Sequence, residues 1–304
     1  MMANDELDQR ALSSARKYMG AVAWPTVFLG LLLVGSYTVV VWLVFFEGLT
    51  LLIGVPAVAL LTHLTYTILH EAAHGSISGG DRSLRWLNDA LGYMAAWVLM
   101  IPLTAHRHEH MAHHRFTNEE ARDPDFHMGQ MCDSVWASVR VVLRASANQF
   151  RFYAEHRWTQ APPKQNVYIV LEVFAALVPR VGLAFAGYWV EALALFVVGW
   201  MLGAIVLLYS FAYLVHRPHE HEGRYENTST ILVPGLLHTP LTWLWMFQNY
   251  HSIHHLYPRV PFYKYAELYA EIEDVLLAKG TPVYRLTARG LEPLAPAGLS
   301  HSVR

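Results

Sequence analysis

Charge is scarce in this sequence. Only 15% of the 304 residues are Asp, Glu, Lys or Arg and 54% are hydrophobic, whereas a soluble domain carries about a quarter charged residues. The two signs nearly cancel, with a formal net charge of −2, so the basic excess expected of a protein with a nucleic-acid partner is missing. The shortage of charge predicts an integral membrane protein.

Cysteine is nearly absent as well. The single Cys132 excludes an intrachain disulfide and any CxxC motif. The sequence also lacks a Gly-rich dinucleotide fingerprint and a fused haem domain. Electrons for any redox chemistry are therefore expected to come from a separate protein.

Long apolar runs are what the sequence has instead. Residues 23–46 form a run of 24 without a charge, and residues 49–69 a run of 21; a membrane-spanning helix needs about 20. Residues 167–215 are mainly apolar for 49 positions, enough for two spans that turn near residues 187–191. The Pro-Arg pair at 179–180 lies inside the first of these without an evident reason. We predict four transmembrane helices.

Two further apolar stretches are too broken to be secure spans. Polar residues, a glycine and a proline interrupt residues 86–104, which are expected to form an interfacial or re-entrant helix, and two prolines interrupt residues 231–247. The expected fold is an all-α integral membrane protein with about four transmembrane helices, interfacial helices and a histidine-rich cap. Its membrane domain is expected at residues 23–279, between a polar segment (1–22) and a flexible tail rich in proline and glycine (280–304).

Basic residues set the expected orientation. Three Lys and Arg residues precede the first span, whereas the turn that follows it carries only Glu47. The positive-inside rule then places the amino terminus in the cytoplasm. Two spans return the chain to that side at His70, and two more at His216. All histidine-rich segments are thereby expected on the cytoplasmic face, of the plasma membrane if the protein is bacterial.

Histidine is the residue in excess, with 18 copies. Many of them recur at helical spacing, so that their side chains share one face of a helix. A random chain of this composition should contain roughly 0.06 copies of H-x-x-H-H, and this one contains two. The clusters are His70 and His74, then His110, His113 and His114, then His251, His254 and His255; His216 stands alone after the fourth span.

Clustered imidazoles predict metal binding. Imidazole is a common ligand for iron, copper and zinc, and eight or nine of them exceed what one ion can use, so two ions are implied. Residues 70–74 also fit the H-E-x-x-H signature of zinc proteases, but a protease would leave the other clusters idle, and zinc settles at four ligands. A pair of irons with open positions for oxygen would use them all.

Two other classes of metal-binding protein fit the pattern poorly. A metal transporter would carry its ligands inside the spans near mid-membrane, whereas these histidines gather at the ends of spans. A haem-binding electron carrier would need single histidines on facing helices rather than adjacent pairs.

The order and spacing of the boxes resemble the membrane fatty acid desaturase and hydroxylase superfamily. The boxes are H-x3-H, H-x2-H-H and H-x2-H-H, and the resemblance extends through residues 110–125 and 249–258. It covers roughly residues 50–270. The resemblance implies two iron ions, O2 as co-substrate, and ligation by His70, His74, His110, His113, His114, His251, His254 and His255, with His216 as the isolated ligand of the family. One position departs from the pattern: acyl-coenzyme A desaturases have an asparagine where this chain has Ala212, so a water-bridged ligand is missing or replaced.

Other polar residues near the boxes have weaker expected roles. Carboxylates often orient the imidazoles that bind a metal, and the candidates, which could equally be ordinary helix-end or loop charges, are Glu71, Glu109, Asp123 and Asp125. His106 and His108 are expected to contact ligands or solvent rather than bind metal, and His63 to be hydrogen-bonded inside its span or to line a substrate channel. His127, His156 and His301 are expected on the surface, and the roles of His219, His221 and His238 stay open.

The resemblance implies O2-dependent oxidation of an unactivated C–H bond in an apolar lipid. Oxygen insertion would give an alcohol and loss of a second hydrogen an alkene, and the sequence does not choose between them. Residues within 214–228 and 256–263 are more similar to carotenoid ring hydroxylases and ketolases than to acyl-coenzyme A desaturases. We therefore expect hydroxylation of a β-carotene-type ring, with fatty acid or acyl-lipid desaturation as the alternative. The electron donor is expected to be a ferredoxin or a small cytochrome that docks at the cytoplasmic face.

Overall fold

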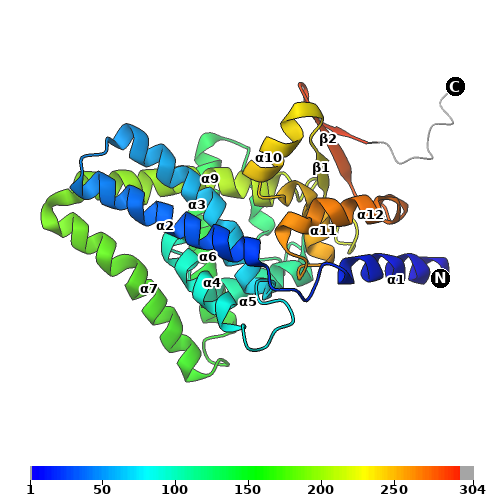
Figure 1. The fold of residues 1–304 in the computed structure, drawn as a ribbon, viewed down its shortest axis with the longest axis horizontal. Helices are drawn as coiled ribbons and strands as arrows, with labels where there is room; N and C mark the ends of the chain where they lie inside the picture. Colours follow the sequence, from blue (N-terminus) through cyan, green and yellow to red (C-terminus); the bar gives the residue numbers. More distant parts are fainter. Residues whose placement is uncertain (1, 295–304) are drawn as a thin grey trace.

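The computed structural model of the chain describes residues 2–294, which are mostly helical (Figure 1). Helices α2 (Trp24–Phe46) and α3 (Leu51–His74) pack against each other, as two apolar runs joined by a short turn should. Helix α3 also packs against α4 (Trp86–Leu99) and α9 (Trp200–Leu208). It is therefore the central helix of the molecule, and the first histidine box lies at its carboxyl end.

Three helical stretches are long and apolar enough to cross a membrane: α2, α3 and residues 163–213. The third runs through α7 (Pro163–Leu183), η2 (Ala184–Tyr188), α8 (Trp189–Leu193), η3 (Ala194–Gly199), α9 and η4 (Tyr209–Tyr213). At Gly187 the φ angle is +106°, which suits glycine because it has no Cβ. Figure 1 shows α7 and α9 diverging from this bend. The bend lies at the turn that the sequence predicts, while the count of four spans stays a prediction.

Helices α4 and α5 (Leu103–Phe116) form a short hairpin that doubles back at residues 100–102. At 14 residues and 1.5 Å per residue, α4 reaches about 21 Å, less than the roughly 30 Å of a bilayer core. Its free terminal carbonyls are covered by side chains: Arg180 donates to the Trp97 carbonyl at 2.7 Å, and the Trp200 indole donates to the Leu99 carbonyl at 2.8 Å. Arg180, unexplained in the sequence, thus caps a helix that ends in the interior.

The other helix end at this turn, the amino terminus of α5, is held by Glu172, also from α7. Its carboxylate accepts hydrogen bonds from the backbone amides of Leu103 and Thr104 and from the Thr104 hydroxyl. A carboxylate at a helix amino terminus satisfies free N–H groups and the helix dipole together. Two ionisable residues of α7 therefore fix the helix that carries the second histidine box.

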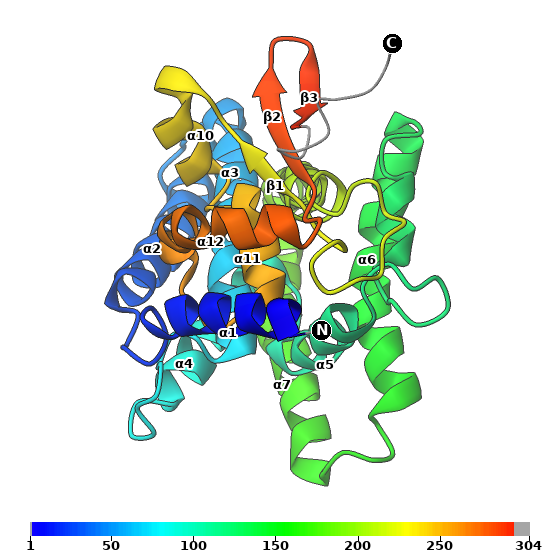
Figure 2. The ribbon, with the colours of Figure 1, turned by 90° about the vertical axis from the view of Figure 1, so that its right-hand side faces the viewer.

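Between α5 and α7 the chain forms η1 (Phe126–Gln130) and α6 (Val135–His156). The later part of the chain forms a smaller lobe of η5 (Gly235–Leu237), α10 (His238–Leu244), η6 (Gln248–Tyr250), α11 (His251–Leu256), η7 (Phe262–Lys264) and α12 (Tyr265–Ala278). The amino-terminal helix α1 (Met2–Arg16) lies along α12 (Figure 2). Ion pairs of Arg10 with Asp274 and of Lys17 with Glu271 join the two helices.

The expectation of an all-α fold is wrong in one place. Strands β1 (Thr230–Leu232), β2 (Val283–Thr287) and β3 (Gly290–Pro293) form a small sheet in the order β1-β2-β3, with β1 and β2 parallel and β2 and β3 antiparallel. Residues 283–293 belong to the segment expected to be a flexible tail, so that expectation is wrong for them. Ile231 and Val283, both buried, anchor the sheet. Residues 295–304 lie outside the described part of the chain.

The sheet also supports the third histidine box. The Ser252 amide donates to the Ser229 carbonyl at 3.3 Å, and the hydroxyls of Thr230 and Ser252 lie 2.6 Å apart. Ser252 is the residue after His251. The start of α11 is therefore held by β1, whose parallel partner is β2.

Replacing Arg180 by methionine should destabilise the fold. The Trp97 carbonyl and the Tyr37 hydroxyl, which accepts from Arg180 at 3.2 Å, would lose their donor in a buried setting, at a cost of about 1–3 kcal/mol. Thermal unfolding in detergent measures the loss as a lower midpoint. The matched control is Arg151→Met on the exposed face of α6, where the expected change is within about 0.5 kcal/mol. Equal midpoints for the two variants would contradict the capping role.

Candidate metal centre

Four segments that are far apart in the sequence bring their histidines together. The carboxyl end of α3, helix α5 and helix α11 carry the three boxes, and His216 follows η4. In α3 and α5 the spacing of three and four residues puts the side chains on one face, as expected. All nine predicted ligands lie in this region of the molecule, which the helices α3 and α5 close on one side and α11 on the other.

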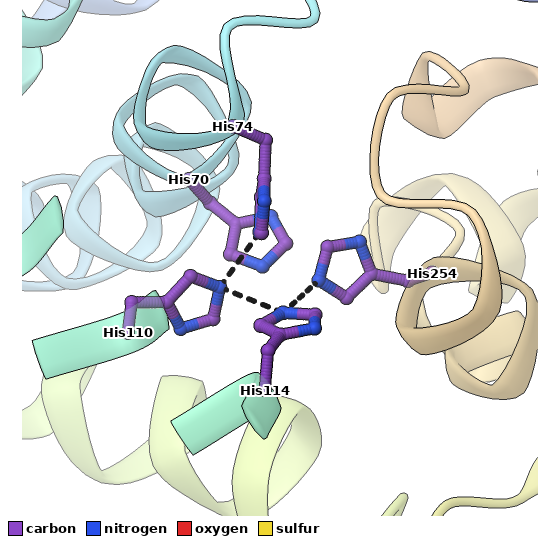
Figure 3. Close-up of side chains that lie close together, drawn as sticks. All are labelled: His70, His74, His110, His114 and His254. Carbon is purple, nitrogen blue, oxygen red and sulfur yellow. Dashed lines mark hydrogen bonds between the residues drawn. The ribbon is translucent and has the colours of Figure 1, made fainter. Parts of the chain in front are cut away.

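Five of these histidines form the first group. Ring nitrogens of His70, His74, His110, His114 and His254 all lie within 4.8 Å of one another. Figure 3 shows the rings converging from α3, α5 and α11. The Nε2 atoms make three close contacts: His74 to His110 at 2.9 Å, His110 to His114 at 3.1 Å, and His114 to His254 at 2.9 Å.

The second group is formed by His113, His216 and His255, again with ring nitrogens within 4.8 Å. The Nε2 atoms of His113 and His216 are 3.0 Å apart. The His251 ring adjoins this group, with its centroid 4.8 Å from that of His216 and 4.7 Å from that of His255. Eight of the nine predicted ligands therefore fall into two groups, and the ninth borders the second.

The outward-facing nitrogens of four rings are fixed by hydrogen bonds. The Nδ1 atom of His113 lies 2.8 Å from Asp123, that of His216 2.8 Å from the Ala212 carbonyl, that of His251 2.8 Å from Gln248, and that of His254 2.9 Å from the Tyr265 hydroxyl. A carboxylate or carbonyl only accepts, so the Nδ1 of His113 and His216 carries the proton. Such contacts select the tautomer whose Nε2 lone pair faces inward, the usual arrangement for a metal-binding histidine.

The first group fits a cation better than it fits hydrogen bonds among its own rings. A neutral imidazole Nε2 offers one proton or one lone pair, yet the Nε2 atoms of His110 and His114 each contact two others. Burial, reinforced by the surrounding histidines, holds the pKa of His110, His114 and His254 well below the ordinary value, so these rings are neutral. A metal ion among them would accept every lone pair at once.

The second group also fits a cation, because a proton now occupies the position that a cation could take. Burial lowers the pKa of His113, but the Asp123 carboxylate outweighs it and raises the pKa to about 9. His113 then holds a proton on Nε2, which it can donate to His216. A bound cation would take the place of this proton, since it is attracted by the same carboxylate and the same lone pairs.

The four carboxylates suggested by the sequence divide into different roles. Asp123 orients a predicted ligand, as expected, and its second oxygen accepts from the Asn118 amide at 2.7 Å. Asp125 is 3.9 Å from the His113 ring, beyond hydrogen-bond reach. Glu109 is buried beside it, and burial raises the pKa of both carboxyls. Glu71 reaches the centre only indirectly: its carboxyl accepts from the Phe262 amide at 3.4 Å and lies beside Tyr265, whose hydroxyl contacts His254.

The remaining histidines lie outside both groups. His106 is buried and stacks on His110 with ring centroids 5.1 Å apart, whereas His108 faces Gln165 on the other side of α5. His63 hydrogen-bonds to the Leu244 carbonyl inside the protein, as expected. His127 is buried, so its expected surface position is wrong: η1 packs against α6 and covers it. His156, His221 and His238 are exposed, His219 is half-buried against Gly129, and His301 is outside the described residues.

Several residues of the centre had no signal in the sequence. Tyr265 reaches His254 from another helix, and the Ala212 carbonyl, four residues before His216, is a backbone group with no residue type to recognise. Gln248 could have been found, because it precedes His251 by three residues and lies next to the third box. Ala212 is also the position where the side chain departs from the acyl-coenzyme A desaturase pattern, and here its backbone orients His216.

The fold and the site define a helical protein with two histidine groups that could hold metal ions and with helices suited to a membrane. Comparison with known families is consistent: the fatty acid desaturase model matches residues 41–287, and the chain belongs to this family. It is similar to a temperature-sensitive sn-2 acyl-lipid omega-3 desaturase (ferredoxin) of Arabidopsis thaliana chloroplasts, with 23% identity over 69% of this chain and 54% of the relative. A chloroplast omega-3 fatty acid desaturase of Sesamum indicum shows 23% identity over 69% of this chain and 52% of the relative.

A shorter match has higher identity. Beta-carotene 4-ketolase 3 of Haematococcus lacustris is 38% identical over 90 residues, which are 27% of this chain and 26% of the relative. The chain thus spans about half the length of the desaturases it matches and about a quarter of the ketolase. The relatives are two desaturases and a carotenoid ketolase, so they do not decide between the two reactions that the sequence leaves open.

Replacing Asp123 by asparagine should weaken metal binding by about 10–100-fold, the usual cost of losing the partner of a ligand histidine. The variant removes the charge that attracts the cation and places an amide donor opposite the Asn118 N–H. Competition with a chelator, read by elemental analysis, measures the affinity. Asp133→Asn at an exposed position is the control. Undiminished affinity in Asp123→Asn would mean that the carboxylate does not support the site.

Proposed function

We propose that this chain is an O2-dependent di-iron oxidoreductase that hydroxylates the ring of a β-carotene-type carotenoid. The observation that carries the proposal is the pair of adjacent groups in which buried imidazole Nε2 atoms converge at the ends of apolar helices. Two groups suit two ions. Membership of the fatty acid desaturase family supports iron and a lipid substrate.

The proposed ligands divide between the two ions. His70, His74, His110, His114 and His254 would hold one, and His113, His216 and His255 the other, with His251 beside them. When bound, the irons would supply activation of O2 and abstraction of hydrogen from an unactivated C–H bond. The chain itself fixes the imidazoles through Asp123, Gln248, Tyr265 and the Ala212 carbonyl, so that little reorganisation is needed.

A cavity of about 50 Å³ near the first group is much smaller than the roughly 300–1,000 Å³ of a ligand pocket, so it would receive only the reacting end of an apolar substrate. One end is lined by polar groups, among them His106, Glu109 and Gln149, and the rest by aliphatic and aromatic side chains of α4, α6 and α9 such as Leu99, Val142 and Leu207. Tyr66 stands between this cavity and the His70 ring, with centroids 5.7 Å apart. The cavity would position one carbon beside the centre and exclude water.

The ring of a carotenoid is favoured over an acyl chain by the matched stretch of the beta-carotene ketolase and by the segments around 214–228 and 256–263. Desaturation of an acyl lipid is the second candidate, because the longer matches are to desaturases. A zinc protease is disfavoured, since Glu71 contacts the Phe262 amide and Tyr265 behind His254 and not the converging ring nitrogens. We place the histidine site on the cytoplasmic side, where a ferredoxin or small cytochrome would deliver electrons.

Product analysis tests the proposal directly. The chain is expressed in cells that accumulate β-carotene, and both the pigments and the fatty acids are profiled. We expect new, more polar carotenoids and an unchanged acyl pool, with no product from His113→Ala. A new double bond in the acyl chains with unchanged pigments would replace the carotenoid assignment by the second candidate.

Iron content tests the division of the ligands. Wild-type protein should hold about two irons per chain, and His255→Ala about one, because only the second group loses a donor. His108→Ala is the matched control, since its ring faces Gln165 away from both groups. Elemental analysis of protein whose circular dichroism matches wild type gives the stoichiometry. Loss of both irons in His108→Ala, or of none in His255→Ala, would refute the assignment.

A further inference from the structure

A hollow lined by arginines opens beside the first histidine group. It has a volume of about 590 Å³ and is lined by the loop after α3, the start of α4 and Arg259 from the loop after α11. Arg82, Arg85 and Arg259 are exposed, and none of the three forms an ion pair with any residue that the structure describes. The one carboxylate in the loop, Asp81, accepts hydrogen bonds from Ser83.

The floor of this hollow is rigid. Asn88, itself buried, accepts hydrogen bonds from the Ile77 and Ser78 amides and donates to the Ser78 hydroxyl at 2.7 Å. Gly79 has a φ of +57°, and a Cβ there would lie 2.3 Å from the Ala21 carbonyl oxygen, so only glycine fits. These contacts hold the backbone of the loop that carries Arg82 and Arg85.

His74 connects the hollow to the metal centre. It lines the hollow and is only partly buried, whereas His70, His110 and His254 of the same group are buried. Its Nε2 lies 2.9 Å from that of His110. A molecule seated in the hollow would thus be separated from the centre by a single imidazole ring.

We propose that the arginine hollow (Arg82, Arg85 and Arg259 around His74) is the docking site of an acidic protein that donates single electrons to the metal centre. The inference rests on the proposed function, because a redox centre needs a donor. Unpaired positive charge around a concave surface attracts a negative partner and raises its rate of association. In each encounter the donor loses one electron and the centre gains one, with no bond made or broken.

Charge reversal tests the site. The full chain is placed in bilayer discs of phosphatidylcholine, and binding of an acidic [2Fe–2S] ferredoxin is measured at low salt. Arg82→Glu/Arg259→Glu should bind at least about tenfold more weakly than wild type, and the difference should shrink at about 0.5 M salt, where charges are screened. Arg140→Glu/Arg144→Glu is the matched control, because these exposed arginines line another hollow on α6. It should bind like wild type.

A second measurement separates docking from the centre itself. Reduction of the iron-loaded protein by dithionite, a small reductant that needs no docking site, should proceed equally in wild type and both variants. Wild-type ferredoxin affinity in Arg82→Glu/Arg259→Glu, or equal weakening in the control, would overturn the proposal. So would unchanged ferredoxin binding with lost affinity for phosphatidylglycerol, which would make the hollow a lipid headgroup site. If wild type held no reducible metal, the proposed function would fail, while the binding measurement would still decide the docking site.

Discussion

The architecture depends on one electrostatic constraint, the convergence of imidazole Nε2 atoms in a buried space, where only His113 attracts a second proton. Lone pairs that face one another repel, and removing them from water is costly unless something positive lies between them. The Nδ1 contacts of His113, His216, His251 and His254 impose this arrangement from outside. Helix packing and these four hydrogen bonds hold the rings from outside, and a cation in front would be shared by the converging nitrogens.

This constraint explains the charged residues inside the helical bundle. The turn between α4 and α5 must lie at a fixed depth, because otherwise the histidines of α5 would shift along the helix axis relative to those of α3. Glu172 and Arg180 of α7 cap the two helix ends at that hairpin. They occupy opposite ends of one junction, so each charge is compensated by backbone dipoles and, for Arg180, by the rings of Trp97 and Phe196.

Much of the centre could be predicted from the sequence, because helical spacing alone puts His70 with His74 and His110 with His114. The grouping of His254 with α3 and α5, and of His216 with His113, requires the tertiary fold. The partner of His254, Tyr265, lies in a different helix from its histidine, and composition misled for the tail, where proline and glycine flank real strands. Buried His127 and capping Arg180 were missed for the same reason: a residue type says little about which neighbours cover it.

Strand β2 has a consequence for how the protein is made. Residues 283–287 pair with β1, and β1 holds Ser252 inside the third box. Synthesis must therefore pass residue 287 before that box is braced, whereas the first two boxes are complete far earlier. A chain that stopped before residue 283 would leave β1 without its parallel partner, and the third box would lose that support.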